Sequence, residues 1–473
     1  MISNLLTILK DGKDSILYEI GDKKVTYEET YYKVRELADN LKKQGNNPVI
    51  LYGHKNIEQF VSILACITAK RSYIPIDLCT PIKRIDEIIK LSDASLLIKN
   101  EDIKIDTIES LTLDELSNKY NIVDTYYEID NNIAYIIFTS GSTGISKGVP
   151  ISYDNLNNFI SWITDLNEFN ECHELNILSE ASFSFDLSLM DIYFSIYKKS
   201  HIIAIDGDTK ENIKSVLDVI LNKKIDFLIM TPTFIKMLLL DYNFKGNNYK
   251  SIKYMFFCGE VLEVETAKKI KERFPHVNII NAYGPTEATC CISLLEITND
   301  MLDKDILPVG KISTSACEIS INNNEIVLKG KSVFDNYLGV SSDSCYKEDN
   351  LSCYKTGDIG YIDGDYLYCN GRLDSQIKYQ GYRIELSDIE NNLLKIDGIT
   401  SACVIAKYKD NSHIVRLIKA FVTIDSNITD TYIKEELTKL IPHYMIPKKI
   451  TILDEIPVNN NGKYDRKKLS DLW

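Results

Sequence analysis

Largely apolar runs alternate with amphipathic segments through most of the chain. Four of these runs have the length and continuity of buried parallel strands, namely residues 49–52, 227–230, 254–258 and 277–280. Amphipathic patterns predict helices around residues 58–70 and 268–273, and Thr231-Pro232 predicts the start of another helix. Apolar strands between helices predict an α/β fold, with parallel-type sheets covered by helices.

The pattern changes after about residue 374. Ser387 and Glu390 form a capping-box spacing that predicts the start of a helix. Shorter elements follow, with strands expected at 402–406 and 419–424 and a helix at 432–440. We therefore expect a large N-terminal lobe, residues 1–373, and a small mobile α+β lobe, residues 374–473. No Gly/Ser/Pro-rich linker separates them, which favours a short hinge.

Composition narrows the class of protein. The 473 residues are 44% hydrophobic and 26% charged, as in ordinary globular proteins, and the net charge of −14 argues against nucleic-acid binding. The eleven cysteines form no Cys-x-x-Cys pair, and the N-terminus lacks a signal-peptide pattern. These features predict a reduced, cytoplasmic chain without a zinc site or disulfides. Apolar stretches such as 63–67 are too short for membrane insertion.

A loop rich in glycine and hydroxyl groups, Thr139–Gly148, follows the apolar run 135–138. Its backbone N–H groups, its hydroxyl groups and Lys147 could cradle phosphate oxygens, because glycine permits a close approach of the backbone. The loop is not a Walker A sequence, because Lys147 precedes Gly148 instead of a Ser or Thr. A simple surface turn is the alternative interpretation. If the loop binds phosphate, the loops after Phe138, Cys258 and Ile280 are candidates to share its cleft, at the carboxyl ends of strands.

Five further islands of polar and glycine residues follow in order: 183–191, 281–289, 354–358, 371–385 and 461–466. Together with the glycine loop, their order and spacing resemble the adenylate-forming enzymes, which include acyl-CoA synthetases, luciferases and nonribosomal adenylation domains. The resemblance covers nearly the whole chain. Phe185-Asp186-Leu187-Ser188 and Cys258-Gly259-Glu260 are most similar to the stand-alone ligases that attach D-alanine to a carrier protein.

The resemblance implies that ATP is a cosubstrate. Tyr283 would stack on adenine, and Asp358 offers two acceptor oxygens for the ribose hydroxyls, although an Asp after Gly is also a common turn residue. Arg372 has a planar fork suited to ribose or phosphate oxygens. The complete expected ATP set is Thr139, Ser140, Gly141, Ser142, Thr143, Gly144, Asn281, Ala282, Tyr283, Gly284, Pro285, Thr286, Asp358, Asn370, Gly371, Arg372 and Lys463.

The resemblance also implies three catalytic residues, Lys147, Glu287 and Lys463. Glu287 with Thr143 would hold Mg²⁺, an ion that prefers oxygen ligands. Lys463 would enter from the small lobe and bridge the substrate carboxylate and ATP. By itself, an Asn-Gly-Lys sequence is ordinarily a solvated turn, so this role depends on the resemblance.

Asp186 bears on the class of substrate. An acid beside an apolar run is costly unless it is paired, and a substrate ammonium group is a natural partner. This interpretation favours an amino acid as the substrate. The alternative is that Asp186 only caps a helix. By resemblance, the amino-acid pocket comprises Asp186, Leu187, Met190, Phe256, Cys258, Cys290 and Lys463, with Cys291 beside it. Cys290 departs from the valine usual in the D-alanine ligases, so D-alanine is the favoured substrate and another small amino acid stays open as the alternative.

The second half-reaction needs a thiol. No cysteine lies in a recognisable catalytic signature with His and Asn or Asp, so we expect an external thiol, the phosphopantetheine of a carrier protein. By resemblance, Asp374 would be the hinge and Gly381 would line the pantetheine passage. A nonribosomal adenylation enzyme for another small amino acid is the main alternative. An acyl-CoA synthetase and a non-catalytic nucleotide-binding module are further alternatives.

Overall fold

The structure is a computed structural model that describes residues 2–120, 132–141, 146–409, 414–458 and 464–472. Its first sheet has neighbouring strands parallel except for the hairpin β7–β8. The order is β6 (Glu109–Leu111), β5 (Leu96–Lys99), β3 (Val49–Tyr52), β4 (Tyr73–Ile76), β7 (Ile133–Thr139) and β8 (Lys147–Ser152).

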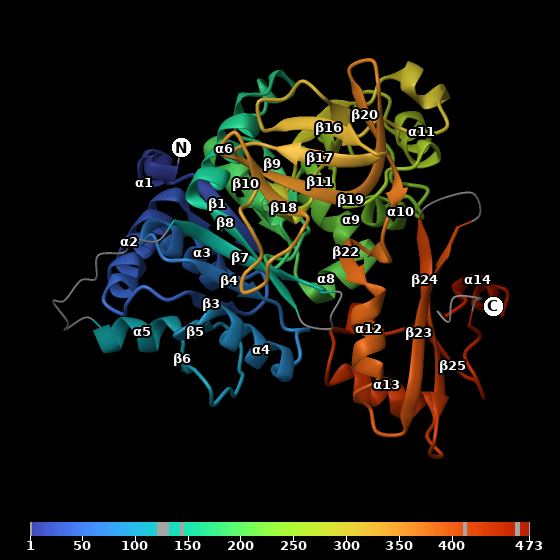
Figure 1. Cartoon of the computed structure of the whole chain (residues 1–473). Helices are drawn as coiled ribbons and strands as arrows, with labels where there is room; N and C mark the ends of the chain where they lie inside the picture. The colour runs from blue at the N-terminus through green and yellow to red at the C-terminus, as the bar shows by residue number, and fades with distance from the viewer. Residues whose placement is uncertain (1, 121–131, 142–145, 410–413, 459–463, 473) are drawn as a thin grey trace.

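A second, eight-stranded sheet is parallel except at its two edge strands (Figure 1). The order is β14 (Ser293–Glu296), β13 (Asn278–Tyr283), β12 (Tyr254–Phe257), β11 (Phe227–Met230), β9 (Asn176–Ser179), β10 (His201–Ala204), β1 (Ile16–Ile20) and β2 (Lys23–Thr26). The predicted strands at 49–52 and 227–230 coincide with β3 and β11.

Helices cover both sheets. One core cluster joins α2 (Tyr27–Lys42), α3 (Ile57–Thr68) and α6 (Tyr153–Asp165) to strands of both sheets, so apolar helix faces are buried between two β layers. The second sheet is covered by α9 (Ile213–Asn222), α10 (Pro232–Leu238) and α11 (Val264–Arg273), and the first sheet by α4 (Ile82–Ser92). Shorter helices complete this part: η1 (Ile2–Asn4), α1 (Leu5–Asp11), α5 (Leu113–Tyr120), η2 (Asn167–Phe169), η3 (Met190–Phe194), α7 (Ser195–Tyr197), α8 (Gly207–Glu211), η4 (Thr286–Ala288) and η5 (Asn299–Asp303).

An antiparallel sheet follows, which the apolar pattern did not predict. It contains β15 (Gly310–Lys311), β16 (Glu318–Asn322), β17 (Glu325–Lys329), β18 (Cys345–Glu348), β19 (Leu351–Asp363) and β20 (Tyr366–Arg372). Its strands alternate buried and exposed positions, as expected where one face is solvated. The α/β class is confirmed, with this sheet as an addition.

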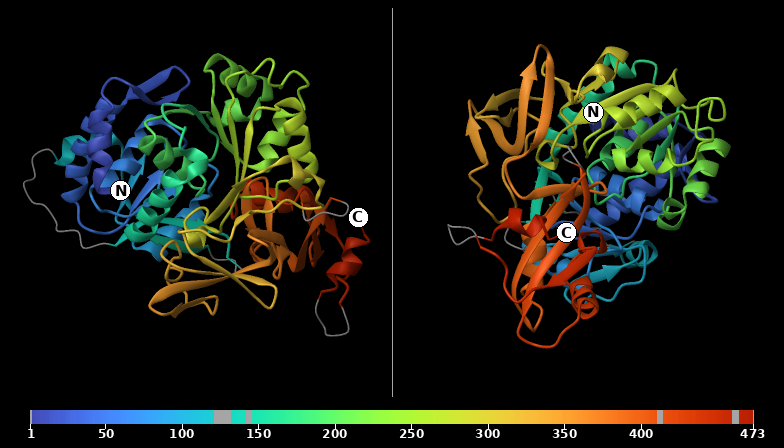
Figure 2. Two further views of the ribbon diagram at one scale, coloured as in Figure 1. Left: turned by 90° about the horizontal axis from the view of Figure 1, so that it is seen from above. Right: turned by 90° about the vertical axis from the view of Figure 1, so that its right-hand side faces the viewer.

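The C-terminal part has its own apolar core, formed by the three-stranded sheet β23–β24–β25 with α12 and α13. Figures 1 and 2 show it in orange and red beside the larger part. The elements are β21 (Gln376–Tyr379), β22 (Tyr382–Glu385), α12 (Leu386–Leu393), β23 (Ile399–Tyr408), β24 (Val415–Ile424), α13 (Asp430–Thr438), η6 (His443–Met445), β25 (Lys449–Ile452) and α14 (Arg466–Ser470). The expected boundary at 373/374 falls between β20 and β21, and it stays a prediction.

Two helix starts test the capping arguments. Thr231 caps α10 as predicted, because its hydroxyl accepts the N–H of Phe234 and Pro232 occupies the first turn. The capping box at Ser387 is wrong. Helix α12 begins at Leu386 with Glu385 in the N-cap position, and the buried Ser387 hydroxyl has no hydrogen-bond partner. Glu385 is tied instead to its hairpin, which sets where the helix begins.

Candidate active site

The glycine loop joins two antiparallel strands, β7 and β8, with Thr139 paired to Lys147 at its base. Ser140 holds the small lobe, because its hydroxyl donates to the Arg383 carbonyl at 3.0 Å and accepts the Glu385 N–H at 2.9 Å. The Lys147 ammonium group lies 5.2 Å from the centroid of the Tyr337 ring. The loop base is therefore in contact with the segment between β17 and β18 and with hairpin β21–β22. Ser142, Thr143 and Gly144 lie outside the described residues.

One cavity of about 30 Å³ brings together residues from four of the sequence islands. That volume is far below the roughly 300 Å³ of an ordinary ligand pocket, so substrates would have to displace side chains to enter. Its lining comprises Phe185, Asp186, Leu187, Cys258, Gly259, Gly284, Pro285, Thr286, Cys290, Asp358, Arg372, Lys378, Gly381 and Arg383. The expected amino-acid pocket and the expected ribose site thus meet at one place.

Asp186 is a buried acid with little neutralising charge. Burial raises the pKa of its carboxyl to about 6, although the hydrogen bond from Thr286 and the positive charge of Lys378 oppose this. The helix-cap alternative fails, because the Ser188 N–H donates to the Phe185 carbonyl and not to the Asp186 side chain. An ammonium group in the cavity would complete the partners of Asp186.

Glu287 is fully buried and, in contrast, fully partnered. Arg383 of the small lobe donates to its Oε2, and the Tyr337 hydroxyl donates to its Oε1 at 2.6 Å. Burial tends to raise the pKa of Glu287, but Arg383 and Tyr337 outweigh burial and hold that pKa below its usual value. In this arrangement the carboxylate that is expected to hold Mg²⁺ is thus bonded to a guanidinium group.

Asp358 and Arg372, which are expected at the ribose, line one part of the cavity. The Tyr283 hydroxyl donates to Asp358 Oδ2 at 2.6 Å, and Arg372 donates to Oδ1 at 2.5 Å. Arg372 also donates to both carboxylate oxygens of Asp374 at 2.8 Å, which fixes its planar fork between two acids. Each Asp358 oxygen could also accept a hydrogen bond from a ribose hydroxyl, because a carboxylate oxygen has two lone pairs.

Cysteine side chains form one wall of the amino-acid side. The thiol of Cys291 shares hydrogen bonds with those of Cys258 and Cys290. The bond from Cys291 lowers the pKa of Cys290, but burial and nearby acids outweigh it and raise that pKa to about 12. Such a thiol stays protonated and is a poor nucleophile.

Thr289 and Cys290 both have left-handed backbone conformations, with φ of 60° and 72°. Consecutive strained residues of this kind cluster at functional sites.

Residues of the hairpin β21–β22 line the cavity, namely Lys378, Gly381 and Arg383. The two-residue turn of this hairpin has positive φ at both positions, 53° at Gln380 and 85° at Gly381, as in a type I′ turn. Gly381, expected in the pantetheine passage, lines the cavity, and its N–H donates to Glu260 Oε1 at 2.7 Å. Asp374, the expected hinge, lies just before β21 and is held by Arg372.

Other expected site residues lie outside the cavity lining. The Asn281 amide nitrogen donates to the Pro308 carbonyl at 2.8 Å, and Ala282 is buried in β13. Asn370 is exposed on β20, next to Gly371. Met190 and Phe256 are completely buried in the apolar core and do not line this cavity. Their expected place in the amino-acid pocket stays a prediction.

Lys463 lies outside the described residues. Its neighbours Val458 and Tyr464 pair with each other, and Arg466 donates to the Val404 carbonyl and to Glu390 of the small lobe. The role expected for Lys463 stays a prediction.

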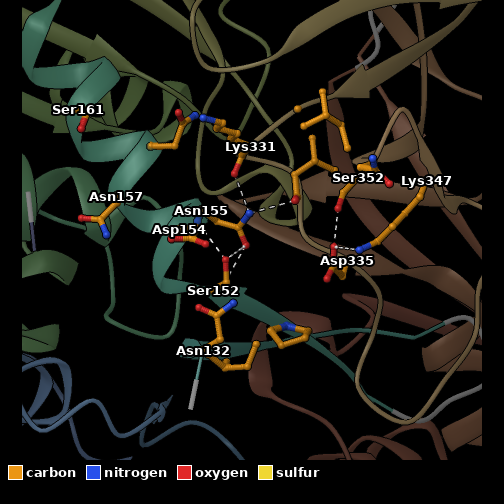
Figure 3. Close-up of a pocket in the computed structure, with 17 residues that line it drawn as sticks. Asn132, Ser152, Asp154, Asn155, Asn157, Ser161, Lys331, Asp335, Lys347 and Ser352 are labelled. Carbon is orange, nitrogen blue, oxygen red and sulfur yellow. Dashed lines mark hydrogen bonds and ion pairs between the residues drawn. The ribbon is translucent and has the colours of Figure 1, made fainter. Parts of the chain in front are cut away.

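A wider polar hollow of about 570 Å³ lies away from this cavity (Figure 3). It is lined by residues of α6, the segment after β17 and the β18–β19 hairpin, and by none of the expected site residues. Asn155 donates to the carbonyls of Lys331 and Val333, and Ser352 donates to Asp335 at 2.5 Å. Several of its polar groups therefore bond one another.

The sequence assignment omitted several residues of the site. Arg383 and Lys378 lie within the 371–385 island but received no role, and Tyr354 lies within another island. Tyr337 lies in no motif, and only its contact with Glu287 reveals it. The sequence did offer a signal for Arg383, because this arginine follows Gly381 within the 371–385 island.

Comparison with known families defines the class of protein. The chain matches the AMP-binding enzyme family over residues 9–338 and the AMP-binding enzyme C-terminal domain over residues 388–463. It therefore belongs to the AMP-binding enzymes, AMP-forming enzymes that use ATP. In the part of the chain that the structure describes, no helix has both the length and the apolar character needed to cross a membrane.

Particular relatives are similar along their full length. The D-alanine–D-alanyl carrier protein ligase of Listeria welshimeri is 36% identical, with 96% of this chain and 95% of the relative covered. The ligase of the same name from Staphylococcus epidermidis is 34% identical, with 100% and 99% covered. Among solved structures, the Vibrio cholerae adenylation domain AlmE with glycyl-adenosine-5′-phosphate has a TM-score of 0.84 at 20% identity, with 99% and 97% covered. That likeness confirms the fold.

Proposed function

We propose that this chain activates D-alanine with ATP to form D-alanyl-AMP and then transfers the D-alanyl group to the phosphopantetheine thiol of a carrier protein. The full-length similarity to D-alanine–D-alanyl carrier protein ligases supports the reaction and its substrate. The observation that carries the amino-acid assignment is Asp186, a buried carboxylate that lines the cavity and has no ion pair with any residue that the structure describes. The reaction would take place in the cytoplasm, where ATP is available, and would serve the D-alanylation of teichoic acids.

In the first half-reaction a carboxylate oxygen of D-alanine attacks the α-phosphorus of ATP, and the bond to pyrophosphate breaks. Both reactants are anions, so the site must align and neutralise them. Asp186 would hold the substrate ammonium group, Asp358 the ribose and the glycine loop with Lys147 the departing phosphates. Lys463 would supply positive charge from the small lobe.

Magnesium would be held by Glu287 with Thr143. Among the described residues no group of three or more His, Cys, Asp or Glu side chains is arranged to hold a metal, which fits an ion bound by one carboxylate and substrate phosphates. The buried Glu287 carboxylate already accommodates a cation, the Arg383 guanidinium. Bound there, Mg²⁺ would neutralise phosphate charge. Arg383 and Mg²⁺ would compete for this carboxylate, so the two half-reactions need different placements of the small lobe.

In the second half-reaction the pantetheine sulfur attacks the acyl carbon, the C–O bond to AMP breaks, and the thiol proton is released. The raised pKa of Cys290 supports an external thiol as the nucleophile. Gly381 lines the cavity, and we propose that the pantetheine arm passes beside it. We assign the observed arrangement of hairpin β21–β22 to this step, because Arg383 occupies the Glu287 carboxylate that adenylate formation would need for Mg²⁺.

Pyrophosphate exchange into ATP with D-alanine, L-alanine, glycine, D-serine and a large amino acid tests the substrate. D-Alanine should give the highest kcat/KM, and subsequent transfer should label a phosphopantetheinylated carrier protein. Preference for glycine or another small residue would favour the nonribosomal alternative. Preference for a large or L-residue would contradict the D-alanine assignment.

Replacement of Lys463 separates the half-reactions. In Lys463→Ala, adenylate formation should fall by about 10²–10³, the usual loss when one preorganised charge is removed. Transfer from preformed D-alanyl-AMP should survive, because the other lobe orientation does not use this lysine. Equal losses in both assays would show that Lys463 has a structural role.

A further inference from the structure

Glu260 joins the two lobes with a single carboxylate. Its Oε2 accepts the N–H of Thr233 in the first turn of α10 at 2.8 Å, and its Oε1 accepts the N–H of Gly381 at 2.7 Å. The side chain is half-buried and follows β12 in the loop next to Cys258 and Gly259, which line the cavity. The tip of the small-lobe hairpin is thus attached to the wall of the active site.

Both donors depend on this acceptor. Thr233 is among the first-turn N–H groups that lack a partner within their helix, and the Thr231 hydroxyl is already used by Phe234. Gly381 lies at a hairpin turn, where its N–H points away from the β21–β22 ladder towards the large lobe. A glutamine at position 260 could accept only one of the two hydrogen bonds, because its NH₂ group would face the other N–H.

The position of Gly381 against α10 also requires a glycine. Gly381 has φ of 85°, and a Cβ added to it would lie 3.1 Å from Thr231 Cγ2. A side chain there would push the hairpin away from Glu260, so the close backbone approach and the hydrogen bond belong to the same contact.

We propose that Glu260 is a positioning residue for the thiol-transfer half-reaction, which holds Gly381 against α10 and stabilises this orientation of the small lobe. This inference rests on the proposed two-step function. Glu260 acts through the hairpin and touches neither reacting group. Adenylate formation, which needs Glu287 free of Arg383, proceeds in another orientation and does not use the contact. Loss of Glu260 therefore slows transfer selectively.

The test is Glu260→Gln in both half-reactions. Transfer from preformed D-alanyl-AMP should slow by about 10–100-fold, the usual effect of losing a hydrogen bond to a charged group, while pyrophosphate exchange changes less than about twofold. The matched control is Glu263→Gln, which removes the nearby ion pairs with Lys236 of α10 and with the exposed Lys409 but keeps the Gly381 bond. The control should leave transfer within about threefold of wild type.

Hydrogen exchange gives a readout that does not depend on turnover. Peptides covering 376–385 should exchange faster in Glu260→Gln and stay protected in Glu263→Gln. If Glu260→Gln melts at a lower temperature than wild type, Glu260→Asp, which keeps the charge on a shorter side chain, should show the same selective loss of transfer.

Equal loss in both half-reactions, or unchanged transfer, would overturn the positioning role. A wild-type enzyme that forms no adenylate with any amino acid would instead overturn the proposed function, so the two failures are distinguishable.

Discussion

Asp186 and Glu287 are two buried carboxylates at one site with opposite electrostatics. Glu287 has Arg383 and Tyr337 as direct partners, and its pKa is held below the usual value. Asp186 has a hydroxyl partner, and burial raises its pKa to about 6. Environments that separate the pKa values of neighbouring acids assign them different roles. Arg383 of hairpin β21–β22 supplies the cation for Glu287, and we propose that the substrate supplies the cation for Asp186.

The largest change should come from Glu287→Gln. Adenylate formation should fall by more than about 100-fold, because the expected Mg²⁺ ligand is lost. The protein should also melt at a lower temperature, because Arg383 loses its buried partner, a loss worth about 3–5 kcal/mol. Pyrophosphate exchange and thermal unfolding measure the two effects. Glu265→Gln, on the exposed face of α11, is the control and should change neither. An active variant with an unchanged magnesium requirement would show that Glu287 only anchors Arg383.

Asp186→Asn should have a smaller and more selective effect. We expect kcat/KM for D-alanine to fall by about 30–100-fold, because one partner of a buried charge pair is removed. The KM for ATP should change little, since Asp358 and Arg372 hold the nucleotide side. Steady-state exchange kinetics with each substrate varied measure both values. An equal increase in the KM for ATP would contradict the division of the site into two sides.

The dependence of kcat/KM on pH should also report on Asp186, with a smaller change than the substitution gives. The ionised form of Asp186 attracts ammonium, so kcat/KM for D-alanine should fall as the pH decreases through about 6. At pH 5 the value should be about tenfold below the plateau. A profile of kcat/KM from pH 5 to 8 measures this, and Asp186→Asn should lack the acidic limb. A limb that persists in the variant belongs to another group.

Much of the fold followed from the sequence because parallel strands buried on both faces are continuous apolar runs. Strands β3 and β11 coincide with their predicted ranges. The antiparallel sheet was missed because half of its positions face solvent, and the start of α12 was missed because hairpin β21–β22 fixes Glu385. Tertiary contacts overrode local preference in both cases.

Some residues of the candidate site were predicted from the sequence and others were not, for a similar reason. Asp186, Asp358 and Arg372 were found because they belong to motifs, and the structure brings them to one cavity. Tyr337 and Glu260 act through contacts between residues far apart in sequence, which spacing alone does not encode. The bulky Met190 and Phe256 have the apolar character expected of a pocket, but they are buried in the core and do not line this cavity, so their role stays a prediction.

The most direct test of the central claim compares D-alanine with propionate, the same acid without its ammonium group, in pyrophosphate exchange. The wild-type enzyme should prefer D-alanine by about 10⁴ in kcat/KM, because propionate would leave Asp186 unpaired. Asp186→Asn should reduce that ratio by at least about tenfold. Activation of propionate as efficient as that of D-alanine, or the same ratio in the variant, would contradict the assignment of Asp186 to the substrate ammonium.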